Sequence, residues 1–232
     1  MISPDIEIEK LAVDRGNILL FVYVSPFCGF AQVALAAACK ELEMQCVLFC
    51  ERDQTIYEEA RLHDLSKLAK AIGAEVYLTE GLKEAESTSQ EYAASQLEAY
   101  KVPLGFDCEE FRSHLYREIK LQWQLVLAQV GDELSTLWLP VGSGTLVSVF
   151  RQVIDSSIPI RGINVNVLEL QDVRIQRLIQ MEGVSITTST QKFRDRADRL
   201  PPIDSNLYYD AKLWSFICSE GVNGDVWWNV AK

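Results

Sequence analysis

Hydrophobic residues occur along this chain in short continuous runs and in longer stretches broken by polar residues. Runs such as 18–24 and 46–50 are typical of strands buried on both faces, as in a parallel sheet. Longer stretches such as 55–72 repeat their apolar positions with helical spacing, and Gly73 follows as a helix cap. Strands that alternate with helices predict βαβ units and an α/β fold with parallel sheets.

The same alternation continues to the carboxyl end of the chain, with no internal repeat. We expect further strands at 75–78, 135–141, 160–167 and 225–230. We expect further helices at 31–42, 87–100, 108–130, 145–154, 170–181 and 210–219. The segment 104–107 has a loop-like sequence, and the charged, proline-terminated segment 191–204 predicts a surface loop or a short helix.

Composition and charge exclude some function classes. The 232 residues are 48% hydrophobic and 24% charged, which is typical of a globular protein in water. No apolar run reaches the roughly 18 residues of a membrane span. The formal net charge of −11 makes general binding of nucleic acid unlikely, because such proteins use basic surfaces. A local basic pocket stays compatible with this charge.

The six cysteines do not indicate a metal site. They form no Cys-x-x-Cys pair, and the chain has only two histidines, so we expect no structural zinc. Cys39 and Cys46 lie in apolar stretches, where buried reduced thiols are usual. The first residues carry no basic export signal. These features predict a protein of the reducing cytoplasm.

The segment Gly142-Ser143-Gly144-Thr145 is the strongest candidate for ligand binding. It follows a predicted buried strand and begins a predicted helix. Glycines leave the backbone accessible, Ser143 and Thr145 add hydroxyl groups, and the helix amino terminus favours an anion. The segment therefore predicts a phosphate site, although a plain strand–helix turn also commonly contains glycine.

Several stretches, in this order, resemble tryptophan-synthase-β-like, fold-type II pyridoxal-phosphate (PLP) enzymes. The similar branch is that of 1-aminocyclopropane-1-carboxylate (ACC) deaminase and D-cysteine desulfhydrase. The stretches are residues 22–38 (strand, serine turn, alanine-rich helix), 68–76 (helix, Ile-Gly-Ala, strand), 142–145 with the strand at 160–163, and, more weakly, 207–212. The resemblance implies two lobes of parallel-sheet βαβ units, reduced in size. Residues 1–130 would form the lobe with the Ser25–Gly29 turn, and residues 131–232 the lobe with the phosphate loop.

The resemblance also implies functional groups. The PLP phosphate would bind Gly142, Ser143, Gly144 and Thr145. Gly29 and Ser25 would lie near the cofactor or the substrate carboxylate. Family members are often dimers, so a homodimer is expected. The expected ligand is an amino acid or a phosphorylated small molecule.

The chain departs from the family pattern where the Schiff-base lysine is expected. That lysine precedes the first matched strand, and here only Lys10 precedes Ser25, in a helix-like context that does not match. Pro26 replaces the asparagine that follows the turn serine, and the usual final Gly-Gly is absent. The chain thus resembles a shortened form without the usual lysine segment. PLP could bind without a lysine anchor, Lys212 could replace that lysine, or the loop could bind another phosphorylated ligand such as a nucleotide.

Three side chains are candidates for catalysis. Cys28 lies in a turn before a helix, where a thiol pKa is lowered. Ser25 ends a strand, where α/β sheets bind ligands. Lys212 follows two tyrosines and matches the late Tyr-x-x-Lys segment of the family. The simpler interpretations are a packed turn thiol, a helix-capping serine and a surface lysine. Asn164 and Asn166, on one predicted strand, would contact a ligand or hydrogen-bond between layers.

The leading hypothesis is a PLP-dependent-like enzyme that acts on an amino acid or its adduct, as a lyase, deaminase or decarboxylase. One alternative is a catalytically degenerate PLP-fold binding module or complex subunit. Another is a phage-type nucleotide or base-modification enzyme that uses the phosphate loop, an interpretation based on fold analogy.

Overall fold

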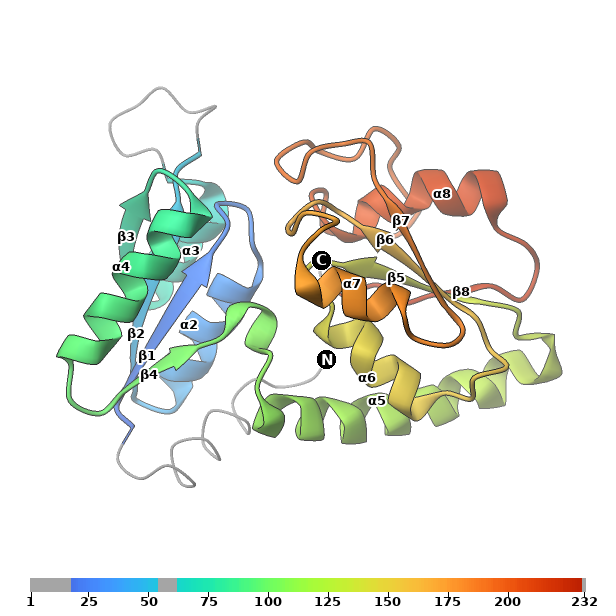
Figure 1. Ribbon diagram of the computed structural model, residues 1–232, viewed down its shortest axis with the longest axis horizontal. Coiled ribbons are helices and arrows are strands. Elements are labelled where there is room, and N and C mark those ends of the chain that lie inside the picture. The colour runs from blue at the N-terminus through green and yellow to red at the C-terminus, as the bar shows by residue number, and fades with distance from the viewer. Residues whose placement is uncertain (1–17, 54–61, 231–232) are drawn as a thin grey trace. The chain divides into compact units, whose positions relative to one another are not determined.

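The computed structural model describes residues 18–53 and 62–230 (Figure 1). The chain divides into two compact units, residues 1–111 and 112–232. Lys10 and the start of the predicted helix 55–72 lie outside the described residues. The sequence predicts a boundary after residue 130, between the two lobes that the family resemblance implies. That boundary stays a prediction.

The first unit contains a four-stranded parallel sheet. Its strands are β1 (Leu20–Ser25), β2 (Gln45–Glu51), β3 (Glu75–Thr79) and β4 (Ala99–Val102), in the order β3-β2-β1-β4. All six residues of β1 are buried, as expected for a central strand with an apolar sequence.

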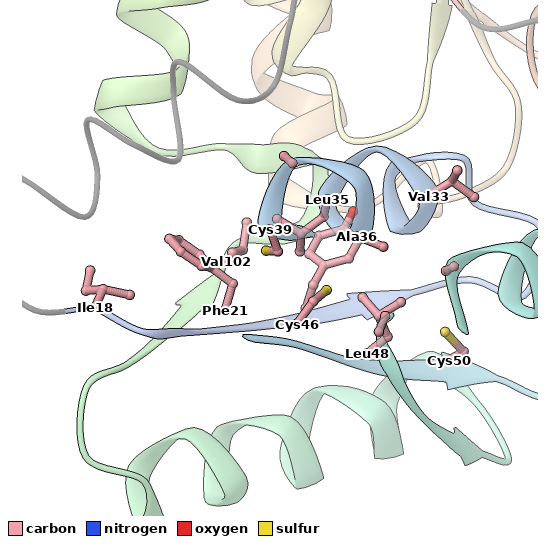
Figure 2. Packing of buried hydrophobic residues seen from close by; sticks show 14 residues of the cluster. Ile18, Phe21, Val33, Leu35, Ala36, Cys39, Cys46, Leu48, Cys50 and Val102 are labelled. Carbon is pink, nitrogen blue, oxygen red and sulfur yellow. The ribbon is translucent and has the colours of Figure 1, made fainter. Parts of the chain in front are cut away.

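Helices cover both faces of this sheet. Helices α2 (Ala31–Glu41) and α3 (Asp64–Ile72) lie on one face, and α4 (Leu82–Ser95) lies on the other (Figure 1). Side chains alternate along β1, so Phe21 and Tyr23 point toward α2 while Leu20, Val22 and Val24 point toward α4. Figure 2 shows the α2 side, where Phe21, Cys39, Cys46 and Leu48 fill the space between helix and sheet.

The second unit also contains a four-stranded parallel sheet. Strands β5 (Leu137–Val141), β6 (Ile160–Asn164), β7 (Val184–Thr188) and β8 (Val226–Trp227) have the order β7-β6-β5-β8. Pro140 lies inside the central strand β5, where a missing N–H would normally break a ladder. Strand β8 pairs with Leu137 and Trp138 alone, so within residues 18–53 and 62–230 no strand lies beside Pro140 on that side.

Helical segments complete the second unit, and the short 3-10 helix η2 (Gly131–Glu133) follows the first of them. The others are α5 (Glu109–Val130), which begins within the first unit, α6 (Thr145–Val153), α7 (Val173–Ile179), the short 3-10 helix η3 (Asp210–Lys212) and α8 (Leu213–Glu220). Helix α8 packs on the Trp138 face of the sheet. Helices α5 and α6 contact each other through the edge-to-face pair Trp123 and Phe150. No described helix is long and apolar enough to cross a membrane.

Both sheets have the same strand order, and this order locates the candidate sites. In each unit the first strand (β1 or β5) has its successor on one side and the last strand on the other. The strand order therefore reverses beside β1 and beside β5. Ligands of parallel α/β sheets bind at the carboxyl ends of strands at such a switch point. The loops at these two points are residues 26–30 and 142–144.

The structure confirms the α/β fold class and corrects some element boundaries. Helix α4 spans 82–95 instead of 87–100, and the four residues after Glu98 form the edge strand β4. Strand β7 at 184–188 was not predicted. Asn166 lies beyond the end of β6, with a positive φ of 66°.

Candidate functional site

The loop after β5 gathers hydroxyl groups at a helix amino terminus. Gly144 is the N-cap of α6 and has a left-handed conformation with φ of 90°. The Ser143 Oγ lies 3.0 Å from the Thr145 Oγ1 and accepts a hydrogen bond from the Thr145 N–H at 3.4 Å. The first turn of α6 thus presents two hydroxyls and the positive end of a helix dipole, which suits an anion.

The two glycines of this loop are packed against side chains of the same unit. A Cβ on Gly142 would lie 3.0 Å from the Tyr209 Oη, and a Cβ on Gly144 would lie 2.9 Å from the Leu178 Cδ1. Packing therefore accounts for Gly142, and packing together with the positive φ accounts for Gly144, without a ligand. The same contact brings the Tyr209 phenol next to the loop, so a third hydroxyl lies at this site.

An unsatisfied acceptor lies beyond β8, the strand on the other side of the switch point. The Asn229 Nδ2 donates to the Asp204 carbonyl at 2.7 Å, which fixes the orientation of the amide. Among the described residues, the buried Asn229 Oδ1 has no hydrogen-bond partner. A buried acceptor without a donor costs free energy, so this position favours a ligand that carries an N–H or O–H group.

The turn after β1 is tightly built around Ser25. The Ser25 side chain is fully buried, and its Oγ donates to the Pro26 carbonyl at 2.9 Å. The Gly29 N–H donates to the same carbonyl at 2.9 Å, which closes the turn. A Cβ on Gly29 would lie 2.6 Å from the Ser25 Oγ, so only glycine fits. Cys28, between them, is 1% exposed.

Gln32, on the first turn of α2, is hydrogen-bonded to the backbone of this loop. It was not identified from the sequence. Its Nε2 donates to the carbonyls of Phe27 and Gly29, and its Oε1 accepts from Cys50 and Ser66. The side chain is fully buried. A single amide inside an alanine-rich, otherwise apolar helix face was the signal that could have revealed it.

Lys212 is buried, so the simpler interpretation as a surface lysine is wrong. It is 1% exposed, and its Nζ donates to the carbonyls of Lys192 and Phe193 at 2.6 Å and 3.1 Å. The ammonium also lies 5.5 Å from the centre of the Phe193 ring. These contacts give it a role in fixing the segment after β7. The catalytic role suggested by the sequence stays a prediction.

The two asparagines of the β6 end bind protein backbone. Asn164 is fully buried, with its Nδ2 donating to Leu168 and its Oδ1 accepting from the Asn166 N–H. The Asn166 Nδ2 donates to the carbonyls of Ser189 and Gln191, both at 2.7 Å. Of the two interpretations of this pair, the structure favours hydrogen bonding within the protein.

The predicted site residues thus form two groups. Ser25, Cys28 and Gly29 meet in one turn of the first unit. Gly142, Ser143, Gly144 and Thr145 form one loop of the second unit, with Tyr209 beside them. Among the described residues, no group of three His, Cys, Asp or Glu side chains is placed to hold a metal.

Comparisons with known proteins match the chain through its structure. No family model and no curated protein matches its sequence. A mutant of O-ureido-L-serine synthase with bound O-ureido-L-serine matches with a TM-score of 0.68 and 16% identity, over 97% of this chain and 75% of that one. An ACC deaminase homologue matches at 0.69 and 15%, over 95% and 77%. A threonine deaminase matches at 0.65 and 14%, over 97% and 80%.

The chain has the fold-type II fold of PLP enzymes. It spans about three quarters of the length of these neighbours. At these identities the likeness establishes the architecture alone. Roles for individual residues in a fold-type II reaction need arguments from the site itself.

Proposed function

We propose that this chain is a PLP-dependent-type enzyme that acts on an amino acid, in the lyase or deaminase class. The fold supports this interpretation, because its structural neighbours are PLP enzymes of those classes. The observation that carries the proposal is the hydroxyl-rich amino terminus of α6 at the switch point of the second sheet. We further expect a cytoplasmic homodimer.

The residues of the loop after β5 suit a phosphate. The hydroxyls of Ser143 and Thr145 and the first turn of α6 would hold it, with the Tyr209 phenol at the edge of the loop. The Asn229 Oδ1 offers a further acceptor for a donor group of a bound ligand. Bound PLP would supply an electron-withdrawing ring, and the protein would supply binding and orientation.

The turn after β1 suits the carboxylate of an amino acid. It lies at the switch point of the first sheet and leads directly into the amino terminus of the eleven-residue helix α2. Backbone N–H groups at such a terminus bind carboxylates without a cationic side chain. Ser25 and Gly29 fix the shape of the turn, and Cys28 would lie on the substrate side.

A second candidate function is a binding module that uses the same two loops without a covalent cofactor link. One observation favours it: Lys212, the lysine that best matches the family motif, uses its ammonium on two backbone carbonyls. A buried amine held in this way must lose both hydrogen bonds before it can react. Nucleotides are then competing ligands for the phosphate loop.

The decisive experiment is an absorbance spectrum of the purified protein with and without PLP, before and after borohydride, followed by mass spectrometry. Absorbance of bound cofactor and a pyridoxyl mass on one lysine peptide support the enzyme. Saturable PLP binding without a lysine-linked mass supports the binding module. The Ser143→Ala/Thr145→Ala double variant should weaken PLP binding about tenfold or more, because two phosphate hydrogen bonds are lost.

A chain that binds no PLP in either measurement contradicts both candidates. Thermal shifts with nucleotides would then test the phosphate loop for a different ligand. Ser215→Ala is a matched control for the double variant, since it removes a helix hydroxyl that donates to the Lys212 carbonyl in the same unit. It should bind PLP as the unmodified chain does.

A further inference from the structure

Helix α5 carries apolar side chains on two opposite faces. Its inner face consists of three buried residues, Leu115, Ile119 and Trp123. On its outer face, Leu121 is 56% exposed and Leu125 is 59% exposed. Both leucines lie roughly 160° around the helix axis from Trp123. Figure 1 shows α6 on one side of α5, and no described element of the second unit covers the other side.

The outer face continues in both directions with the spacing of a coiled coil. Its residues are His114, Glu118, Leu121, Leu125 and Ala128, at intervals of four, three, four and three residues. Alternating intervals of this kind keep side chains on one line along a helix, and two helices pack together along such lines. The spacing therefore fits a second helix.

The carboxyl-terminal part of α5 carries no charged residue. Residues 121–130 are all uncharged, in a chain with 24% charged residues. Charges are depleted from the buried centres of protein interfaces, because a charge loses its hydration there. A helix that lies on a membrane surface would instead carry Lys or Arg along its polar face. The composition thus favours a protein partner.

The outer face is complementary to a second copy of itself when the two helices run antiparallel. A two-fold axis at the level of Trp123 places Leu121 opposite Leu125 of the partner subunit, and the reverse pair follows by symmetry. Glu118 then faces Ala128 of the partner subunit, so these two carboxylates stay apart. Parallel pairing would place Glu118 beside Glu118 of the partner subunit, where like charges repel.

We propose that the outer stripe of α5, residues 114, 118, 121, 125 and 128, is the surface through which two copies of this chain pair in antiparallel orientation. This inference specifies the surface of the homodimer expected above, and it does not depend on PLP binding. The stripe extends only about 21 Å along the helix, so we expect a dimer that dissociates on dilution.

Sedimentation velocity of the full chain over a concentration series tests the proposal. The unmodified chain should change from monomer to dimer as the concentration rises. Leu125→Lys should weaken this association about tenfold or more, because symmetry places two ammonium groups against leucine. Leu200→Lys is the matched control, since Leu200 is 64% exposed and lies in the segment between β7 and η3. That variant should associate as the unmodified chain does.

A double variant tests the orientation of the two helices. Leu121→Glu alone should weaken association as Leu125→Lys does. In antiparallel pairing, Leu121→Glu/Leu125→Lys places each new carboxylate opposite a new ammonium of the partner subunit, so it should associate more tightly than either single variant. In parallel pairing each new charge meets its own kind. Circular dichroism of every variant checks that the chain is folded.

Three outcomes would overturn the inference. One is an unmodified chain that stays monomeric at every concentration. Another is a dimer that Leu125→Lys leaves unchanged, because a different face must then form the contact. The third is a folded double variant that associates no more tightly than the single variants, which rejects the antiparallel orientation. A monomer that binds PLP refutes only this interface, and a dimer that binds no PLP refutes only the proposed function.

Discussion

Three glycines of the two candidate loops show how single residues set the backbone here. Gly29 faces the Ser25 hydroxyl and Gly144 faces Leu178, both too closely for an additional carbon atom, and Gly142 faces Tyr209 closely enough that a carbon atom would displace the phenol. The sequence suggested that glycines leave room for a ligand. The structure shows that the room is used by the protein, so the loops owe their shape to internal packing.

Gly29→Ala should destabilise the protein by about 1–3 kcal/mol, because the new Cβ would lie 2.6 Å from the buried Ser25 Oγ. Urea unfolding followed by circular dichroism measures the change. In a Ser25→Ala background the clash with oxygen disappears, so the same substitution should cost less. Equal costs in both backgrounds would show that the contact with Ser25 is not the cause.

The buried phenol of Tyr23 makes stability depend on alkaline pH. Burial raises its pKa from 10.0 to about 12, although the Gly105 N–H that donates to its oxygen lowers it. A raised pKa favours the protonated group in the folded state. Its stabilising contribution is complete below pH 10 and is lost as the pH rises through 12.

The free energy of unfolding should therefore fall between pH 10 and 12, by about 1.4 kcal/mol per pH unit from this group. Tyr23→Phe has no phenol to ionise, so its stability should decline less steeply over the same range. Urea unfolding at several pH values compares the two slopes. Parallel slopes would mean that Tyr23 ionises equally easily in both states.

At the scale of elements, the segment between β7 and η3 has little regular structure and depends on side chains for its position. Asn166 binds the carbonyls of Ser189 and Gln191, and Lys212 binds those of Lys192 and Phe193. The segment leads to Tyr209 beside the phosphate loop. Asn166 and Lys212 therefore influence the position of a residue beside the phosphate loop, although they bind the segment elsewhere.

Lys212→Met should free this segment and cost about 1–3 kcal/mol, since two carbonyls lose a charged donor. Hydrogen exchange measured by mass spectrometry should become faster in residues 189–209. Lys192→Met is the control: it removes an exposed lysine of the same charge but leaves the Lys212 ammonium in place. Unchanged exchange in Lys212→Met would argue against an anchoring role.

Long apolar or strongly periodic elements could be predicted from the sequence, and short ones could not. Strand β1 and helices α2, α5 and α6 lie within two residues of their predicted bounds. Strand β4 has only four residues at a sheet edge, and β7 is half-buried, so neither has the continuous apolar run of a central strand. Both are strands because a neighbouring strand pairs with them.

The site was predictable only in part, for a related reason. The loops at 25–29 and 142–145 follow buried strands, and sequence alone can show that. The contact of Tyr209 with Gly142 and the bonds of Gln32 to Cys50 and Ser66 join distant segments. Pairings of this kind depend on strand order, which hydrophobic patterns do not contain.

At the scale of the whole molecule, the chain builds the same strand order twice without a repeat in its sequence. Each unit has its own sheet and its own buried cluster, as Phe21 with Leu48 and Trp138 with Ile163 show. Strand order is set by the burial of apolar strands and by the connections between consecutive strands. Many different sequences can meet these two requirements. Helix α5 begins in the first unit and continues in the second, so it is the element that could couple their unfolding.

We expect the two units to unfold separately, because each buries its own core. Gly29→Ala should speed hydrogen exchange in β1 and β2 only. Gly144→Ala, which strains a residue at φ of 90° and crowds Leu178, should cost about 1–3 kcal/mol and speed exchange in β5 and β6 only. Hydrogen exchange at low denaturant, measured separately for each strand, tests both predictions.

If either substitution accelerates exchange equally in both sheets, α5 transmits the loss of stability and the chain is one cooperative unit. The turn after β1 and the loop after β5 would then gain or lose their shape together, and ligand binding at one would stabilise the other.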